Sequence, residues 1–153
     1  AGGQNWVPER DFGEAGESGA WRIEASPSTA RATDYFLNVM QVSDASSNTT
    51  PLACTLIETS EIAGTKISNR IAIFAKDADR IEDSFTFTVP GSENNLKLFV
   101  AGVKEGVWKV QKNGEPHHQY QVASAEGGVL YFTGSAGSYT LTLEQAPAPY
   151  QVN

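Results

Sequence analysis

The chain has 153 residues, of which 40% are hydrophobic and 19% charged, and its formal net charge is -7. This length suits one domain with a real core. The 18 acidic residues outnumber the 11 basic ones, which argues against nucleic acid or an anionic membrane surface as a partner. No apolar run reaches the roughly 18 residues that a membrane span needs, so we expect a soluble folded domain.

The first residues, AGGQNWVPER, lack an initiating Met, a basic segment and an apolar segment. We therefore expect a mature form or a fragment of a larger protein. The single cysteine, Cys54, excludes an internal disulfide and a cysteine-based metal cluster. The expected organisation is an N-terminal arm over residues 1–18, a β-sandwich domain over 19–145 and a C-terminal tail over 146–153.

Short segments rich in β-branched and aromatic residues follow one another along the chain, separated by Gly, Pro, Asn, Asp or Ser. The predicted strands are WRIEA (21–25), DYFLNVMQV (34–42), ACTLIETS (53–60), KISNRIAIFAK (66–76), SFTFTV (84–89), NLKLFVAG (95–102), GVWKVQKN (106–113), HQYQVAS (118–124), GVLYFTG (128–134) and SYTLTLEQ (138–145). No window long enough for a helix shows a sustained helical stripe of apolar residues. The pattern therefore predicts an all-β protein of about ten strands.

Alternation along these strands assigns one face to the core and one to solvent. In SFTFTV, for example, the apolar residues share one face and the hydroxyl residues the other. Trp21 and Tyr35 begin two such apolar faces on either side of a loop containing Pro27, so both strands are expected in the core. Asn113–Gly114 is a strong hairpin signal. We expect a two-layer antiparallel β-sandwich.

Five segments carry a resemblance to a known family. They are WRIEASP, DYFLNVMQVSD, RIAIFAKDADRIEDSFTFTVPG, LFVAGVKEGVWKVQKNGE and GGVLYFTGSAGSYTLTL. Together they resemble the C-terminal β-sandwich domain of heparinase II/III-like polysaccharide lyases and related secreted glycan-degrading proteins. In such lyases the Tyr and His residues of the β-elimination reaction lie upstream, in a helical toroid and a central sheet domain. The resemblance therefore implies an accessory domain without catalytic residues.

The residues themselves favour no assembled catalytic or metal site. His117 and His118 are adjacent on a predicted strand and are expected to point to opposite faces. No GxSxG elbow occurs, and Cys54 is interpreted as a small core residue. The acidic run Asp77–Asp83 resembles a calcium loop in composition, but Ile81 stands where a third oxygen ligand is needed. We expect no cofactor, although a structural calcium near this run stays open.

Sugar polymers are bound by aromatic rings and polar side chains, and by Lys or Arg where the polymer is acidic. The stretch 97–120 supplies these residue types. The predicted carbohydrate-binding residues are Lys97, Lys104, Trp108, Lys109, Lys112, His118 and Tyr120. Strand alternation separates Trp108 and Lys112 from Lys109, so one flat patch cannot hold all seven. Trp108 has two interpretations, a stacking platform or a core residue, and Trp6 with Arg10 forms a second aromatic and basic pair.

The sequence thus predicts a noncatalytic carbohydrate-binding module of a secreted or periplasmic polysaccharide-degrading enzyme. Its expected partners are an acidic polysaccharide, such as a glycosaminoglycan or alginate, and the catalytic domain of the same parent chain. The alternative is a purely structural C-terminal domain that makes no glycan contact. A small freestanding enzyme is a third hypothesis.

Overall fold

The computed structural model describes residues 25–44, 46, 50–76, 79–122 and 127–145. The chain divides into two units, residues 1–35 and 36–153, and every strand described lies in the second. The predicted arm over 1–18, the predicted strand 21–25 apart from Ala25, and the predicted tail over 146–153 lie outside the described residues. Trp6, Arg10 and Trp21 also lie outside the described residues.

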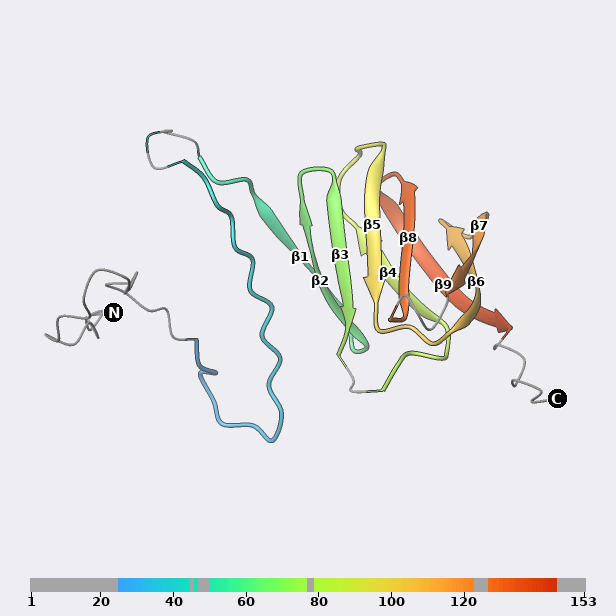
Figure 1. Ribbon diagram of the computed structural model, residues 1–153, viewed down its shortest axis with the longest axis horizontal. Helices are drawn as coiled ribbons and strands as arrows, with labels where there is room; N and C mark the ends of the chain where they lie inside the picture. The colour runs from blue at the N-terminus through green and yellow to red at the C-terminus, as the bar shows by residue number, and fades with distance from the viewer. Residues whose placement is uncertain (1–24, 45, 47–49, 77–78, 123–126, 146–153) are drawn as a thin grey trace, which may run out of the picture. The chain divides into compact units, whose positions relative to one another are not determined.

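Among the described residues, nine strands form two sheets that pack face to face (Figure 1). The strands are β1 (Cys54–Glu58), β2 (Ile62–Ile67), β3 (Arg70–Ala75), β4 (Phe85–Val89), β5 (Leu96–Ala101), β6 (Gly106–Lys112), β7 (Glu115–Val122), β8 (Val129–Gly134) and β9 (Gly137–Gln145). The five-stranded sheet has the order β1-β2-β3-β5-β8, and the four-stranded sheet has the order β4-β9-β6-β7. The predicted all-β sandwich of about ten strands is confirmed.

Apolar residues from both sheets meet in one core between the layers. The largest of the fully buried side chains are Trp108, Tyr139 and Phe87. Phe87 stacks on Tyr139 with ring centroids 5.6 Å apart, and the edge of Phe85 meets Trp108. The strict alternation that the sequence shows in β4 reappears as alternating buried and exposed residues. Strand β3 pairs with β5 in parallel, whereas the other described pairings between named strands are antiparallel.

Two turns show how local residues set the strand count. The predicted strand 66–76 is divided by a turn at Ser68 and Asn69, where Ser68 adopts a positive φ of 52°. Its first two residues end β2 and the part after the turn forms β3, whereas the first four residues of β2 were not predicted to be a strand. The predicted hairpin at Asn113–Gly114 is confirmed: both residues have positive φ, and β6 pairs with β7 across them. Asn113 also accepts a hydrogen bond from the backbone N–H of Ser138 at 2.9 Å, which ties the turn to β9.

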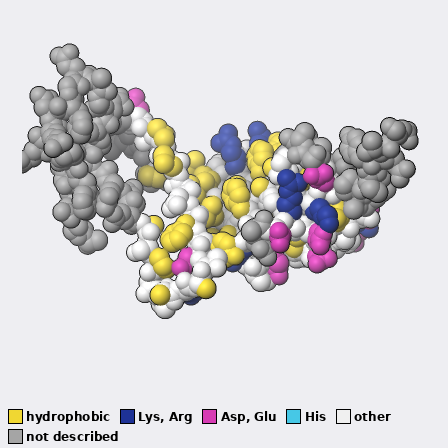
Figure 2. Space-filling model, turned by 60° about the horizontal axis from the view of Figure 1, so that its bottom comes forward, with side chains coloured by type: hydrophobic (Ala, Val, Ile, Leu, Met, Phe, Trp, Pro, Cys, Tyr) yellow, Lys and Arg dark blue, Asp and Glu magenta, His cyan; other side chains and the backbone are white. Residues whose placement is uncertain are grey.

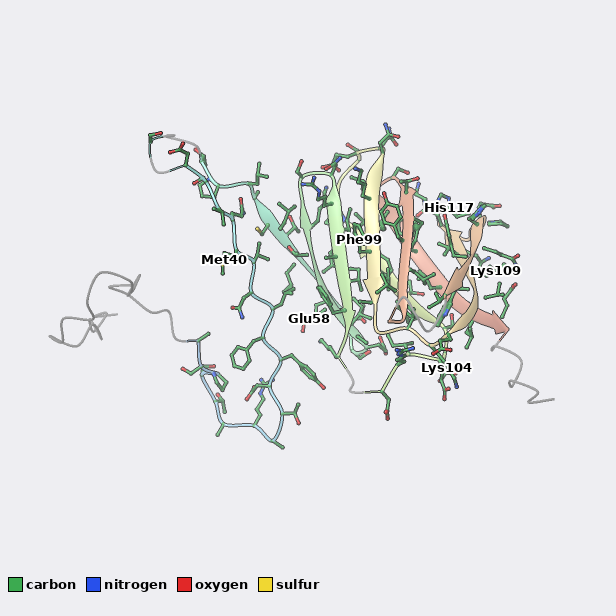
Figure 3. The ribbon with its side chains drawn as sticks, in the orientation of Figure 1. Met40, Glu58, Phe99, Lys104, Lys109 and His117 are labelled. Atoms are coloured by element: carbon green, nitrogen blue, oxygen red, sulfur yellow. The ribbon has the colours of Figure 1, made fainter. Side chains whose placement is uncertain are left out.

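The prediction of a core strand over residues 34–42 is wrong. This segment is extended but belongs to no described strand, and its side chains are exposed (Met40 88%, Val42 90%) (Figure 3). The side-chain amide of Gln41 accepts a hydrogen bond from the N–H of Leu52 and donates one to the carbonyl of Leu52, both at 2.8 Å. The segment is apolar on both faces, which is why its sequence resembled a core strand. The described strands form their core without it.

Candidate functional site

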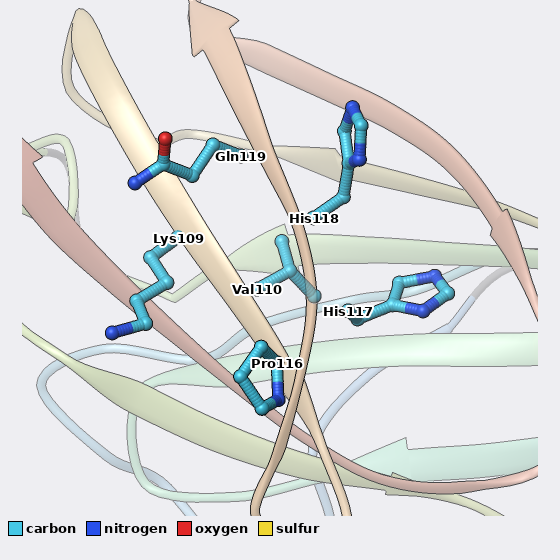
Figure 4. Close-up of a pocket in the computed structure, with 6 residues that line it drawn as sticks. All are labelled: Lys109, Val110, Pro116, His117, His118 and Gln119. Atoms are coloured by element: carbon cyan, nitrogen blue, oxygen red, sulfur yellow. The ribbon is translucent and has the colours of Figure 1, made fainter.

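The hairpin of β6 and β7 carries a pocket of about 490 Å³. It is lined by Lys109, Val110, Pro116, His117, His118 and Gln119 (Figure 4). Strand β7 is the edge of the four-stranded sheet, a position that tolerates Pro116 because an edge strand needs fewer backbone N–H groups for pairing. The register between the two strands shifts between Val110 and Gln111. This β-bulge re-aims the side chains of β7 and so shapes the pocket.

The bulge brings the two histidines to one aromatic cluster, so the prediction that they point to opposite faces is wrong. His117 donates from Nε2 to the carbonyl oxygen of Thr133 on β8 at 2.9 Å, and its ring meets those of Phe132 and Tyr139. The ring of His118 lies 4.7 Å from that of Tyr120. In Figure 4 both imidazoles lie on the same side of β7. His117 therefore connects the two sheets through Thr133, and both imidazoles are exposed and line the pocket.

Tyr120 lies beside the pocket without lining it. Its ring stacks on Phe132 at 5.3 Å and contacts His118, so it links the core to the exposed hairpin. Burial raises the pKa of the Tyr120 phenol above its ordinary value. The hydroxyl therefore stays protonated at neutral pH and is a hydrogen-bond donor, not an anion.

The lysines of the hairpin differ in how far their charge is compensated. Lys109 lies 3.4 Å from a carboxylate oxygen of Glu144, which also accepts a hydrogen bond from Gln119. Lys112, at the end of β6, forms no ion pair with the described residues. Lys112 is thus the hairpin cation most available to an anionic ligand, while Lys109 can serve one only by sharing its charge with Glu144.

Three of the predicted binding residues lie away from the hairpin pocket. Lys97 is on the outer face of β5 in the other sheet, and Lys104 precedes β6 and is paired with Glu82. Trp108 is fully buried (0% exposed), and its indole Nε1–H donates to the carbonyl of Lys104 at 2.7 Å. Its ring therefore serves the core and offers no face to a sugar. Of the predicted residues, Lys109 and His118 line the pocket, Tyr120 contacts His118, and Lys112 lies at the end of β6 on the same hairpin without lining the pocket.

Gln119 and Pro116 line the pocket but were not among the predicted binding residues. Strand alternation could not predict the position of either residue, because the bulge, which adds His117 to β7 opposite Val110 and Gln111, is not visible in the sequence. Exposed aromatic side chains on the five-stranded sheet, including Phe99 and Tyr131, were also not among the predicted binding residues. Their signal was present, since each alternates with residues that are buried in the core.

In the described part of the chain, no group of three or more His, Cys, Asp or Glu side chains is placed to hold a metal ion. Asp77 lies outside this part, so the acidic run that resembles a calcium loop is only partly described. No helix there is long and apolar enough to cross a membrane.

Comparisons with known proteins give one assignment. A search of curated proteins found no match to this chain. The family model described as the heparinase II C-terminal domain matches residues 56–143, which is more than half of the chain. The match begins within β1 and ends within β9, so it spans both sheets and includes the hairpin pocket. The resemblance stated from the sequence is thereby confirmed, and the chain belongs to the heparinase II C-terminal domain family.

Proposed function

We propose that the chain is a noncatalytic accessory domain of a secreted or periplasmic polysaccharide lyase and that it binds an acidic polysaccharide. Membership of the heparinase II C-terminal domain family supports the link to a polysaccharide substrate and to a parent catalytic domain. The observation that carries the binding proposal is the hairpin pocket, where imidazole, amide and ammonium groups meet at one accessible surface.

The chemistry of the pocket suits a charged sugar. His118 and Gln119 supply hydrogen-bonding groups for hydroxyls, and Lys112, at the end of β6 on the same hairpin, would supply a positive charge for a carboxylate or sulfate. The ring of Tyr120 adds an apolar surface whose tip is a hydroxyl donor. These contacts are few per sugar unit, so binding to short oligomers is expected to be weak and binding to long chains stronger through rebinding.

The overall charge of -7 does not oppose this proposal. At physiological salt, charges separated by more than about 8 Å are largely screened, so a local cation decides how a polyanion is attracted. Lys109 contributes less than Lys112 because Glu144 lies 3.4 Å away. The proposal therefore makes Lys112 the most important charged residue of the hairpin.

Affinity gel electrophoresis tests the proposal on the complete chain. Gels containing alginate, chondroitin sulfate or heparin should retard the wild type, and Lys112→Gln should migrate faster than the wild type in the same gel. Lys104→Gln is the matched control, since it removes the same charge at the opposite end of β6 from a lysine already paired with Glu82. Retardation that both variants reduce equally would indicate a general charge effect and would contradict the assigned site.

A purely structural role is the second candidate function. The exposed apolar side chains of residues 35–42, together with exposed Leu56 and Phe74, favour it because such surfaces mark contacts with other proteins or domains. In this case the domain would pack against its parent catalytic domain without touching sugar. Hydrogen exchange of the chain alone and of the whole parent protein tests this role. The structural role would be favoured if the amides of residues 35–42 were protected only in the parent protein and if glycan gels did not retard the chain.

A further inference from the structure

The outer face of the five-stranded sheet carries a cationic and aromatic surface that is distinct from the hairpin pocket. Its six residues, called the sheet platform below, are Arg70, Ala72, Lys97, Phe99, Tyr131 and Thr133. They come from β3, β5 and β8, and their immediate strand neighbours Ile71, Leu98 and Phe132 are buried in the core. Because side chains alternate along a strand, the six platform residues all face outward.

Strand register arranges the sheet platform as two rows. Arg70, Lys97 and Thr133 form one row across the three strands, and Ala72, Phe99 and Tyr131 form the next. Neighbouring strands lie about 4.8 Å apart, and residues two positions apart on one strand lie about 6.6 Å apart. A row of cations therefore runs beside a row of aromatic rings, at a separation comparable to the size of one sugar unit.

The aromatic row presents apolar ring surface to solvent. Phe99 is 43% exposed and Tyr131 is 48% exposed, and their ring centroids lie 4.7 Å apart. Figure 3 shows Phe99 on the five-stranded sheet, well separated from Lys109 and His117 on the hairpin side. Figure 2 shows that hydrophobic side chains are exposed at several places, with Lys and Arg side chains among and beside them. Such rings can pack against the apolar face of a pyranose.

The cationic row has an electrostatic cost that an anion would relieve. Arg70 and Lys97 are register partners on adjacent strands, and both are exposed. Neither forms an ion pair with any described residue, although most other described lysines are paired with carboxylates. Like charges opposite each other on neighbouring strands destabilise a sheet. A carboxylate placed between them would gain charge-assisted hydrogen bonds from both side chains.

We propose that the sheet platform is a binding site for a uronate-containing polysaccharide. A sugar ring lies against Phe99 and Tyr131, and its carboxylate is held between Arg70 and Lys97. This goes beyond the hairpin pocket, because it assigns a second surface on the opposite sheet and makes the carboxylate the recognised group. A protein partner on this face is the competing outcome, and the two adjacent cations without an acidic partner favour the acidic sugar.

Nuclear magnetic resonance titration of the complete, isotopically labelled chain tests the platform. The probe is a β-1,4-linked mannuronate tetrasaccharide, and the matched neutral probe is the β-1,4-linked mannose tetrasaccharide, which lacks the carboxylates. The mannuronate should shift the backbone amides of residues 97–99 and 131–133, and the mannose oligomer should shift them far less. The variant carrying Arg70→Gln and Lys97→Gln should bind mannuronate about tenfold more weakly. An unchanged melting temperature of this variant is the control that it is folded.

The remaining outcomes separate this proposal from the hairpin site. Shifts confined to residues 109–120 would overturn the platform and leave the proposed function standing, whereas shifts at the platform alone would support the platform. No shifts at all would overturn both, and equal shifts with the neutral oligomer would overturn carboxylate recognition. Concentration-dependent broadening of platform amides without sugar, abolished by Tyr131→Thr, would show a self-association face and would also overturn the proposal.

Discussion

Trp108 donates its indole Nε1–H to the backbone carbonyl of Lys104 at 2.7 Å from a fully buried position. This bond fixes the segment that leads into β6, and it satisfies a polar group that would otherwise be unpaired in the core. The most conspicuous aromatic residue of the predicted binding stretch is thus a structural residue. Ligand binding is left to exposed side chains, and the variants below separate the two roles.

Substitution of Trp108 should reduce stability without a direct effect on glycan binding. Trp108→Phe removes the hydrogen bond to Lys104 and part of the ring, and we expect a loss of about 1–3 kcal/mol in the free energy of unfolding. Trp108→Ala should cost about 3–5 kcal/mol because it leaves a cavity. Urea denaturation measures both. A Trp108→Phe protein of unchanged stability that migrates freely in glycan gels would contradict the core assignment.

The pairing of Lys66 with Glu93 should make stability depend on acid. Lys66 is nearly buried, and its Nζ donates to Glu93 at 2.6 Å and to the carbonyl of Pro90 at 2.7 Å. The hydrogen bond from Lys66 is the main cause that lowers the pKa of the Glu93 carboxyl. A lowered pKa in the folded state means that this stabilisation is present above the unfolded pKa of about 4.5 and is lost as pH falls through the folded value.

Glu93→Gln should therefore lower the free energy of unfolding at pH 7 and flatten its decline in acid. Thermal denaturation between pH 7 and pH 3 measures this, and Glu82→Gln, at an exposed ion pair with Lys104, is the comparison. Equal stability of Glu93→Gln and wild type at pH 7 would show that the pair contributes nothing.

His117 and His118 should differ in their effect on stability although they are adjacent. His117→Gln disturbs the bond to Thr133 and the contacts with Phe132 and Tyr139, which connect the two sheets. We expect it to cost about 1–2 kcal/mol. Both side chains are exposed, but His118→Gln removes a ring contact with Tyr120 instead of a hydrogen bond between the sheets, and it should stay within about 0.5 kcal/mol of wild type. Urea denaturation of the two variants measures both losses. A larger loss from His118→Gln than from His117→Gln would contradict the assignment of His117 as the histidine that connects the sheets.

Much of the sandwich follows directly from residue alternation and turn chemistry. The alternation in β4 and the Asn113–Gly114 turn predict the observed strand and hairpin because local geometry decides both. The sequence predicts the positions of the proposed binding residues less well. The bulge at Val110 and Gln111 redirects His117, and the burial of Trp108 depends on contacts with Phe85 from a distant strand. Periodicity cannot reveal either effect. It also cannot show whether an apolar segment such as 34–42 has a partner.

Substitutions in the segment 34–42 should leave the stability of the sandwich unchanged. Met40→Ser and Val42→Ser replace exposed apolar side chains and should alter the free energy of unfolding by less than about 0.5 kcal/mol. Ile73→Ala is the contrast: Ile73 is buried in β3, and its truncation should cost about 2–5 kcal/mol. Circular dichroism during urea unfolding measures all three. A large loss from Met40→Ser would show that the segment belongs to the folded core.

The salt dependence of binding to long-chain alginate tests the central claim, that this acidic chain binds an acidic polysaccharide through local cations, most directly. Affinity should be measurable at low ionic strength and should fall steadily as sodium chloride is added, since exposed charge pairs are screened by salt. The variant carrying Arg70→Gln, Lys97→Gln and Lys112→Gln should bind weakly at every salt concentration. Absence of binding at low salt, or an affinity that neither salt nor these substitutions change, would contradict the claim.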